Sequence, residues 1–556
     1  MSKIYVNGSQ TGQTFSPNFN LNSLLSNTVV QRSNDDVVKV QLTEPGVYYI
    51  TKTICFCCNL IIEGCEGAII EVKFSTANDY SDDSFLEFMN IYQGVHHRRN
   101  IVIKNIEFKI NNSHFWSSSY PSFYFLKFYA SGSVHIDNVK MRLDGHPITN
   151  FDFRECWNVV IENYLLENYH ENVQETNLGG VIWFSGNVKN VKIVNNILKK
   201  AGNDELLAFF GHYLDDTNVV VPDDEKPPLY LCKKDNIIVK NNIIVYKRPV
   251  TTGTDYSNDC LVVLCDRDTI NPSSQGTKQY LFENIIFESN NFIINDHCRS
   301  IFNTKFEEQT ILRNVCYQNN NIEVGDFNVN GGYVSVFSLN NKFPGIDTIY
   351  EISGNTLYNK AEIKNFANVE DQNNLPALFF LIQNGGKVSV KGNITRISED
   401  TKFKKIRFLW NNYFTNKTII ENNDLEGLFI LGSLDCAPNY SLTCDLLIKD
   451  NIIKGDTRIY CYNLTDMALT FDGNHIESYH DVIALQDGAG SIFNYINNHV
   501  VVHEPISSFY YSSNSHNIDS CCVANNVFEN LPSNAMNIFN NNVTSTVQVV
   551  QNNIQL

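Results

Sequence analysis

The chain has 556 residues and a formal net charge of −18, with 43% hydrophobic and 18% charged residues. Nucleic-acid binding requires basic patches that meet the phosphates, so this acidic balance argues against a nucleic-acid partner. No run of about 18 apolar residues is present, so we predict no membrane span. The apolar fraction itself is typical of a folded globular protein.

The first segment, residues 1–38, is rich in Asn, Ser and Thr and has few long apolar runs. We interpret it as a leader that caps the first repeat or serves as an attachment segment, because an open sheet edge must be covered. The start MSKIYVNGSQ lacks the apolar core of a signal peptide, so we expect synthesis in a cytosol. The 15 cysteines are then expected to be free thiols, and no metal or cofactor is predicted.

A repeated pattern follows the leader and is clearest at residues 190–211, NVKIVNNILKKAGNDELLAFFG. Its alternating apolar residues predict two short strands, the Asn-Asn pair between them predicts a turn, and residues 206–210 predict a third strand. A β-branched strand precedes and follows nearly every such Asn, which indicates a true repeat. Further copies lie at 100–110, 134–143, 158–166, 236–245, 284–294, 314–324, 349–358, 388–395, 418–427, 446–455, 469–478, 492–501 and 520–530.

One repeat of this size cannot bury its own apolar side, so the repeats must stack. Strand-rich repeats stack as a parallel β-solenoid, in which each strand pairs with its counterpart about 4.8 Å away in the next rung. The repeated Asn would then form a ladder of side-chain amides along the stack. We therefore predict an all-β fold, a single solenoid over residues 39–556 with roughly 14 rungs.

The segment GVYYITKTICFCCNLIIEGCEGAIIEV, residues 46–72, supports this prediction. Together with the repeat, it resembles the right-handed parallel β-helix proteins of the pectin-lyase-like superfamily, where a Gly-x-Tyr-x-Ile strand opens the first rungs. The resemblance covers residues 40–556 and implies a single-stranded right-handed parallel β-helix. The catalytic motif sets of polygalacturonases and alginate epimerases are missing, so the resemblance transfers no catalytic residue.

Two interruptions of the repeat, residues 212–234 and 266–280, fall one rung apart. The first contains Pro222, Pro227 and Pro228, which cannot donate to a continuous ladder. We predict that both segments project from the stack as loops that wall a groove. Long loops of this kind usually carry function.

The third strands of successive rungs can be aligned, and alternate residues of each strand point outward. In residues 148–156, Phe151 and Phe153 would face the interior, which leaves Asp152 and Arg154 outside. The predicted outward ribbon contains Asp152, Arg154, Trp183, Glu205, Asp266 and Arg299. The catalytic candidates are Asp152, Asp204, Glu205 and Asp266, and the substrate-binding candidates are Arg154, Trp183, His212, Arg267, Arg299 and Asn303.

This ribbon suits sugar chemistry, because an exposed Trp offers a flat face to a pyranose ring and paired carboxylates can hydrolyse a glycosidic bond. Carboxylates one rung apart would lie about 5 Å from each other, near the distance in retaining enzymes. Asp152 and Glu205, two rungs apart, would be separated by about 9.5 Å, the upper end of the inverting range. A lyase would instead combine a base with a cation such as Arg154 or Arg299.

The compact rungs, the Asn-rich surface and the start of the chain resemble phage tailspikes and depolymerases. That resemblance implies a homotrimeric virion protein that contacts other tail proteins and binds and cleaves a bacterial surface polysaccharide, as a hydrolase or a lyase. The alternative is a non-catalytic structural or receptor-binding virion protein of the same fold. A third interpretation is a secreted bacterial enzyme without its signal peptide.

Overall fold

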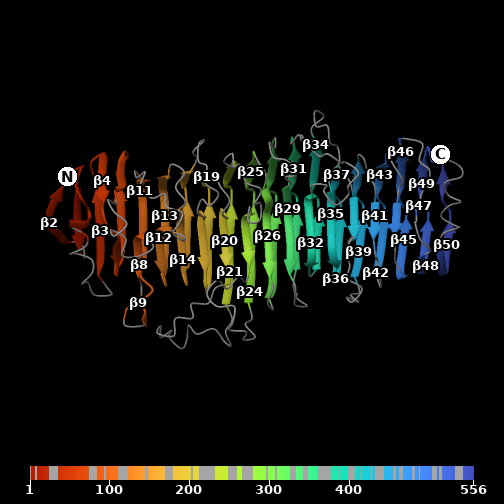
Figure 1. The fold of residues 1–556 in the computed structure, drawn as a ribbon, viewed down its shortest axis with the longest axis horizontal. Coiled ribbons are helices and arrows are strands. Elements are labelled where there is room, and N and C mark those ends of the chain that lie inside the picture. The colour runs from red at the N-terminus through yellow and green to blue at the C-terminus, as the bar shows by residue number, and fades with distance from the viewer. Residues whose placement is uncertain are drawn as a thin grey trace. The chain divides into compact units, whose positions relative to one another are not determined.

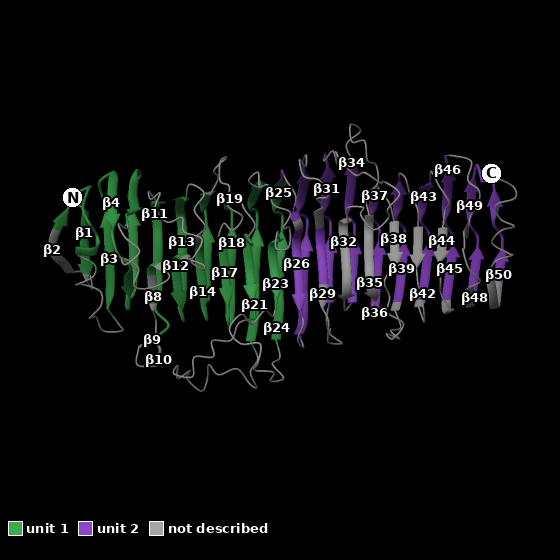
Figure 2. Ribbon diagram, viewed as in Figure 1, with its two compact units in different colours: residues 1–293 green, residues 294–556 purple. Residues whose placement is uncertain are grey.

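The computed structural model divides into two compact units, residues 1–293 and 294–556, and each is described separately (Figure 2). Both units consist almost entirely of β-strands. Among the described residues, no helix is long and apolar enough to cross a membrane. The described residues are 2–6, 9–23, 25, 36–73, 84–89, 91–92, 95–110, 123–143, 148–168, 180–201, 205–211, 232–247, 260–265, 280–295, 298–306, 310–325, 334–341, 349–360, 377–385, 387–397, 407–414, 416–426, 429–432, 444–454, 459–462, 467–478, 483–486, 489–503, 510–511, 516–531 and 543–556.

The repeat at residues 190–211 forms the predicted three strands, β18 (Val188–Val194), β19 (Ile197–Ala201) and β20 (Leu207–Phe210). Each of them pairs in parallel with the corresponding strand of the next rung, which defines a parallel β-helix (Figure 1). The first two strands of a rung belong to a long sheet, and the third belongs to a second sheet. The predicted fold class is therefore confirmed.

In residues 1–293 the long sheet contains β3 (Val37–Leu42), β4 (Gly46–Ile50), β6 (Asn59–Gly64), β7 (Ala68–Val72), β11 (Asn100–Ile110), β13 (Ser133–Arg142), β15 (Trp157–Glu162), β16 (Leu165–Asn168), β18, β19, β21 (Cys232–Lys240), β22 (Ile243–Lys247), β24 (Tyr280–Glu288) and β25 (Asn291–Ile294), which ends at the unit boundary. The second sheet contains β5 (Ile54–Phe56), β8 (Ser84–Met89), β12 (Phe123–Tyr129), β14 (Ile148–Arg154), β17 (Ile182–Ser185), β20 and β23 (Cys260–Cys265). Two short strands, β9 (Ile91–Tyr92) and β10 (Val95–His96), pair antiparallel.

Residues 294–556 repeat this arrangement. Their long sheet contains β27 (Thr310–Gln318), β28 (Asn321–Val324), β30 (Ile349–Ser353), β31 (Thr356–Asn359), β33 (Lys387–Lys391), β34 (Ile394–Ile397), β36 (Asn416–Glu421), β37 (Asp424–Glu426), β39 (Cys444–Lys449), β40 (Ile452–Lys454), β42 (Met467–Asp472), β43 (His475–Ser478), β45 (Ala489–Ile496), β46 (His499–Val502), β48 (His516–Ala524), β49 (Val527–Glu529), β50 (Val543–Gln551) and β51 (Ile554–Gln555). The remaining strands are β26 (Cys298–Phe306), β29 (Val334–Asn341), β32 (Ala377–Gly385), β35 (Arg407–Phe414), β38 (Phe429–Gly432), β41 (Ile459–Tyr462), β44 (Ile483–Gln486) and β47 (Tyr510–Tyr511).

The two residues of the Asn-Asn turn have different structural roles, which the sequence did not reveal. The first Asn adopts a left-handed backbone, as Asn195 does with φ of 58°, which Asn tolerates better than most residues. The second Asn is buried, and its side chain bonds to the next rung: Asn196 Nδ2 donates to Asn242 Oδ1 at 2.8 Å. The predicted amide ladder is confirmed, and in residues 294–556 it runs through Asn320, Asn355, Asn393, Asn423, Asn451, Asn474, Asn498, Asn526 and Asn553.

In residues 1–293 the interior of the second sheet contains a stack of phenylalanine rings, one from each of its strands from β5 to β20, and Leu264 takes the same place on β23. Phe153 lies between Phe128 and Phe184, with ring centroids 4.7 and 4.9 Å apart, and all three side chains are fully buried. The orientation predicted for Phe151 and Phe153 is therefore confirmed. This stack fixes which side chains of the same strands face outward.

The N-terminal strands cover one edge of the first rung. β1 (Ser2–Val6) and β2 (Ser9–Phe15) form an antiparallel pair, and β1 also pairs antiparallel with β3. The free edge of β3 thereby gains a partner, which is the usual protection for an exposed strand.

The predicted loops are shorter than expected from the sequence. Residues 232–234 belong to β21, and Tyr280 begins β24, because both segments resume the ladder there. The other residues of the predicted loops, 212–231 and 266–279, lie outside the described part of the chain.

Candidate functional site

The outward face of the second sheet in residues 1–293 is organised in columns, because its strands pair in register. The first outward column consists of Lys127, Asp152, Trp183, Ala208 and Val263. The second outward column consists of Tyr129, Arg154, Ser185, Phe210 and Cys265.

The charged residues of these columns are Lys127, Asp152 and Arg154. The last two form an ion pair on β14. Arg154 Nε donates to Asp152 Oδ2 at 2.7 Å, and a second guanidinium nitrogen donates to the Tyr129 hydroxyl at 3.0 Å. The Asp152 side chain is 2% exposed and the Arg154 side chain 22% exposed. Asp152 therefore holds Arg154 in place, and its carboxylate is committed to that cation.

Aromatic rings surround this pair. The Lys127 ammonium lies 5.5 Å from the ring centre of Tyr124 and 5.1 Å from that of Tyr129, which is within cation–π range. The ring centre of Tyr124 also lies 6.0 Å from that of Trp183, with the two planes nearly perpendicular. Two cations and three aromatic rings thus meet on adjacent rungs.

The electrostatics of the cluster keep Arg154 charged and the Tyr129 phenol protonated. Burial alone would lower the pKa of Arg154, but the Asp152 carboxylate together with Tyr129 and Tyr124 more than offsets this and raises it. Burial raises the pKa of Tyr129, and the neighbouring Arg154 and Lys127 only partly oppose that rise. The Tyr129 hydroxyl therefore remains available as a proton donor at neutral pH.

Trp183 separates the charged part of the face from an apolar part. Its indole packs beside Phe210, with ring centres 5.3 Å apart, and against a buried cluster that also contains Ala208, Cys260, Val263 and Cys265. The indole Nε1 is buried and has no hydrogen-bond partner. It lies so close to Gly180 that a Cβ there would be 2.0 Å from Nε1, so any other residue at this position would displace the indole.

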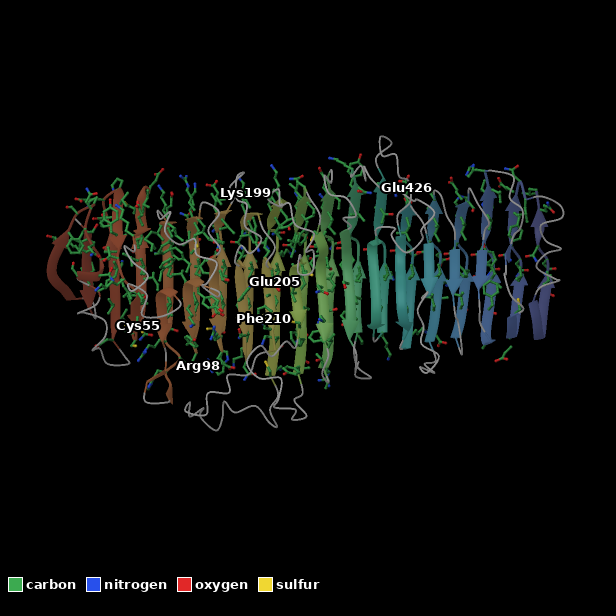
Figure 3. All side chains as sticks on the ribbon, viewed as in Figure 1. Cys55, Arg98, Lys199, Glu205, Phe210 and Glu426 are labelled. Atoms are coloured by element: carbon green, nitrogen blue, oxygen red, sulfur yellow. The ribbon has the colours of Figure 1, made fainter. Side chains whose placement is uncertain are left out.

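Glu205 does not join the predicted column. It precedes β20, and its carbonyl accepts from the Val181 amide at 3.1 Å, so it aligns with the start of the preceding strand (Figure 3). Ala208, three residues later, occupies the place in the first outward column. Three residues along a strand span about 10 Å, so Asp152 and Glu205 are not stacked two rungs apart as expected.

The other predicted residues fall into two groups. Asp204, His212, Asp266 and Arg267 lie outside the described residues. Arg299 and Asn303 belong to β26 in residues 294–556, where Asn303 is half-buried and pairs in register with Ser338. Their roles stay predictions.

The sequence reasoning missed Lys127, Tyr124 and Tyr129. They lie in the apolar segment SFYFLKFYA, residues 122–130, whose outward residues were not assigned from the sequence. The available signal was Lys127, the single charged residue within that apolar run.

No family model and no curated protein matches this chain. Among solved structures, tailspike protein 3 of bacteriophage CBA120 matches with a TM-score of 0.26 and 10% identity over 93% of this chain, which spans 56% of that protein. A mannuronic acid specific polysaccharide family 6 lyase from human gut microbiota matches with a TM-score of 0.25 and 13% identity, covering 83% of this chain and 82% of the lyase. The pre-mature gene product 12 of bacteriophage phi29 matches with a TM-score of 0.21 and 8% identity, over 93% of this chain and 68% of its own length.

Proposed function

We propose that this chain binds an acidic polysaccharide on the outward face of β12, β14 and β17. The observation that carries the proposal is the cluster of Lys127 and Arg154 with Tyr124, Tyr129 and Trp183. In a chain of net charge −18, two cations held among aromatic rings form a local site for an anion. Sugar rings stack on aromatic faces, so a uronic-acid polymer satisfies both features.

The same geometry favours cleavage by elimination over hydrolysis. Hydrolysis needs two working carboxylates, whereas Asp152 is committed to Arg154 and Glu205 lies outside its column. In an elimination, a base takes the C5 proton of a uronate, the C4–C5 double bond forms, and the C4–O4 bond breaks. Arg154 and Lys127 would stabilise the negative charge that develops on the sugar carboxylate.

Tyr129 is the proposed proton donor to the departing O4 oxygen. Its raised pKa keeps it protonated, and its hydroxyl accepts a hydrogen bond from Arg154, which fixes its position. The base is sought among the predicted acidic residues Asp204, Glu205 and Asp266.

The proposal is tested with a panel of acidic and neutral bacterial polysaccharides. Elimination releases reducing ends and raises ultraviolet absorbance, because it leaves an unsaturated sugar. Release of reducing ends without an absorbance rise would establish hydrolysis instead. Glu205→Gln is expected to abolish cleavage without changing thermal unfolding if Glu205 is the base, and unaltered turnover removes it from the list.

A second candidate, binding without cleavage, is favoured by the ion pair of Asp152 with Arg154, because that carboxylate is then not available as a base or nucleophile. Retained polysaccharide binding with no product in either assay would support this alternative.

The proposal also places the protein in a phage tail, as a homotrimer that contacts other tail proteins. Its support is the resemblance of the sequence to tailspikes and depolymerases. Light scattering of the purified chain measures the oligomer, and a monomer at micromolar concentration would contradict the trimer.

A further inference from the structure

The outward face of the long sheet carries columns in which acidic and basic residues alternate. Lys104 follows Glu63 in register and their charged atoms lie 3.1 Å apart, and Glu288 follows Lys240 at 2.8 Å. In residues 294–556 Lys391 and Glu421 pair in the same way at 3.1 Å. This alternation avoids like charges on directly opposed residues, which destabilise a sheet.

One place where the alternation fails is Asp137 of β13, which pairs in register with Glu162 of β15. The two carboxylates occupy successive rungs, about 4.8 Å apart along the stack. His135 lies two residues before Asp137 on the same face, and its Nε2 is 2.8 Å from Glu162 Oε1. The three residues offer one nitrogen and two oxygen atoms within 4.8 Å of one another.

A second pair of successive carboxylates shows how the sheet neutralises such a contact. Asp235 of β21 pairs in register with Glu283 of β24, and Lys233 lies two residues before Asp235. The Lys233 ammonium bridges both acids, at 3.0 Å from Asp235 and 3.1 Å from Glu283. Burial alone would lower the pKa of Lys233, but these two carboxylates raise it, so the bridge carries a full positive charge.

The two carboxylate pairs also have equivalent asparagine neighbours. Asn163 Nδ2 donates to Asp137 Oδ1 at 2.9 Å, and Asn284 Nδ2 donates to Asp235 Oδ1 at 3.2 Å. The difference is the third residue, which is a lysine in one place and a histidine in the other. A neutral imidazole cannot supply the charge that Lys233 supplies, but it can share a cation with the two carboxylates.

Within the described part of the chain, the register neighbours of His135 and Asp137 do not replace that cation. Val102 and Val160 are its register partners in the neighbouring strands. Lys104 is the register partner of Asp137, and its ammonium is engaged by Glu63 at 3.1 Å. All three ligand residues lie on paired strands and none lies on a loop. The sheet therefore holds them in place before an ion binds, which is the preorganisation that a metal site needs.

We propose that His135, Asp137 and Glu162 bind a divalent transition-metal ion, Zn²⁺ by preference. One imidazole nitrogen and two carboxylate oxygens suit Zn²⁺, whereas Ca²⁺ prefers six to eight oxygen ligands. The side chains of His135 and Glu162 are 40% and 32% exposed, which leaves the fourth position of a tetrahedral site to water. The site lies on the long sheet and is independent of the proposed polysaccharide site.

The test uses the full chain, stripped with a chelator and titrated with Zn²⁺ alone in a calorimeter. We expect one saturable site in the native protein and a loss of affinity of at least about tenfold in Asp137→Asn. His135→Lys reproduces the Lys233 arrangement, so it is expected to abolish Zn²⁺ binding and keep the unfolding temperature. Lys233→His is expected to create a second Zn²⁺ site.

The matched control is His499→Gln, which removes another histidine–glutamate pair, His499 with Glu529 at 2.7 Å. Zn²⁺ affinity is expected to be unchanged in this variant. The proposal is overturned if the native chain shows no saturable binding. It is also overturned if the binding survives His135→Lys at full affinity.

Discussion

The two ends of the outward face in residues 1–293 can be compared directly, because their strands pair in one register. At β12 and β14 the outward positions hold Lys127, Tyr129, Asp152 and Arg154, whereas at β20 and β23 the same positions hold Ala208, Phe210, Val263 and Cys265. The interior side chains are phenylalanines on β14 and on β20 alike. The outward positions of a rung can therefore hold either charged or apolar side chains in the same register. Each end of the face can thus have a function of its own.

The largest expected effect comes from placing a charge in the apolar end. Ala208→Asp would bury an unpaired carboxylate at the column position that Asp152 occupies on β14. We expect a loss of roughly 3–5 kcal/mol in the free energy of unfolding, measured by urea denaturation. Ala208→Val provides the control for size. An equal loss in both variants would mean that volume, rather than charge, separates the two ends.

Removing the cation at the charged end is expected to cost about 3 kcal/mol, because Arg154→Gln leaves Asp152 buried without its ion pair. The double variant Asp152→Leu with Arg154→Met gives the charged end the character of the apolar end. It is expected to be more stable than Arg154→Gln and to bind no acidic polysaccharide. Binding retained by the double variant would disprove the assignment of the site.

Gly180→Ala tests the boundary between the two ends. The new Cβ would meet the indole of Trp183, so the ring must shift, at an expected cost of about 1–3 kcal/mol in unfolding free energy. Trp183→Phe removes the nitrogen that the Cβ would meet, so adding Gly180→Ala to it should cost less. Equal costs in the two backgrounds would contradict the proposed contact.

The smallest effect concerns thiols near the first strands of this face. Hydrogen bonding from Cys55 lowers the pKa of Cys57 to about 6 against the opposing effect of burial, with help from the Arg99 cation. Burial raises the pKa of Cys156 to about 12. Alkylation of Cys57 by iodoacetamide should rise as the pH increases through about 6 and then level off, because the thiolate is the reactive form. Peptide mass spectrometry measures this, with Cys156 as the unreactive reference; a Cys57 midpoint near pH 9 would contradict it.

The strands and turns could be predicted from the sequence because their signals are local. Alternation within β18 and the Asn195-Asn196 turn each occupy fewer than ten residues, and the turn recurs with Asn, or with Gly, Ser or Asp as at Gly354, Ser289 and Asp450, in the left-handed position. Alternation also indicated correctly that Phe153 faces inward while Arg154 faces out.

The site itself depends on pairing between strands that are far apart in the sequence, and the alternation within one strand does not predict that pairing. Lys127 meets Asp152 only through the pairing of β12 with β14, and Glu205 leaves the column because β20 begins two residues after it. The ion pair between Asp152 and Arg154 could have been predicted from the sequence, since the two residues lie two positions apart on the same face of one strand. The sequence could not show that Asp152 and Arg154 are buried together, so that their ion pair takes the centre of the site.

The buried Asn ladder has a consequence for how such a chain changes length. Each amide bonds to the equivalent amides of the rungs directly before and after it and to a nearby backbone carbonyl, as Asn474 does with Asn451, Asn498 and Ile448. Deleting one entire turn of the coil would bring two equivalent amides together and restore every bond, whereas deleting a few residues would leave donors unmatched along the stack. Descendants of this gene are therefore expected to gain or lose material in whole turns within the coil, and to vary freely in the segments that join its sides.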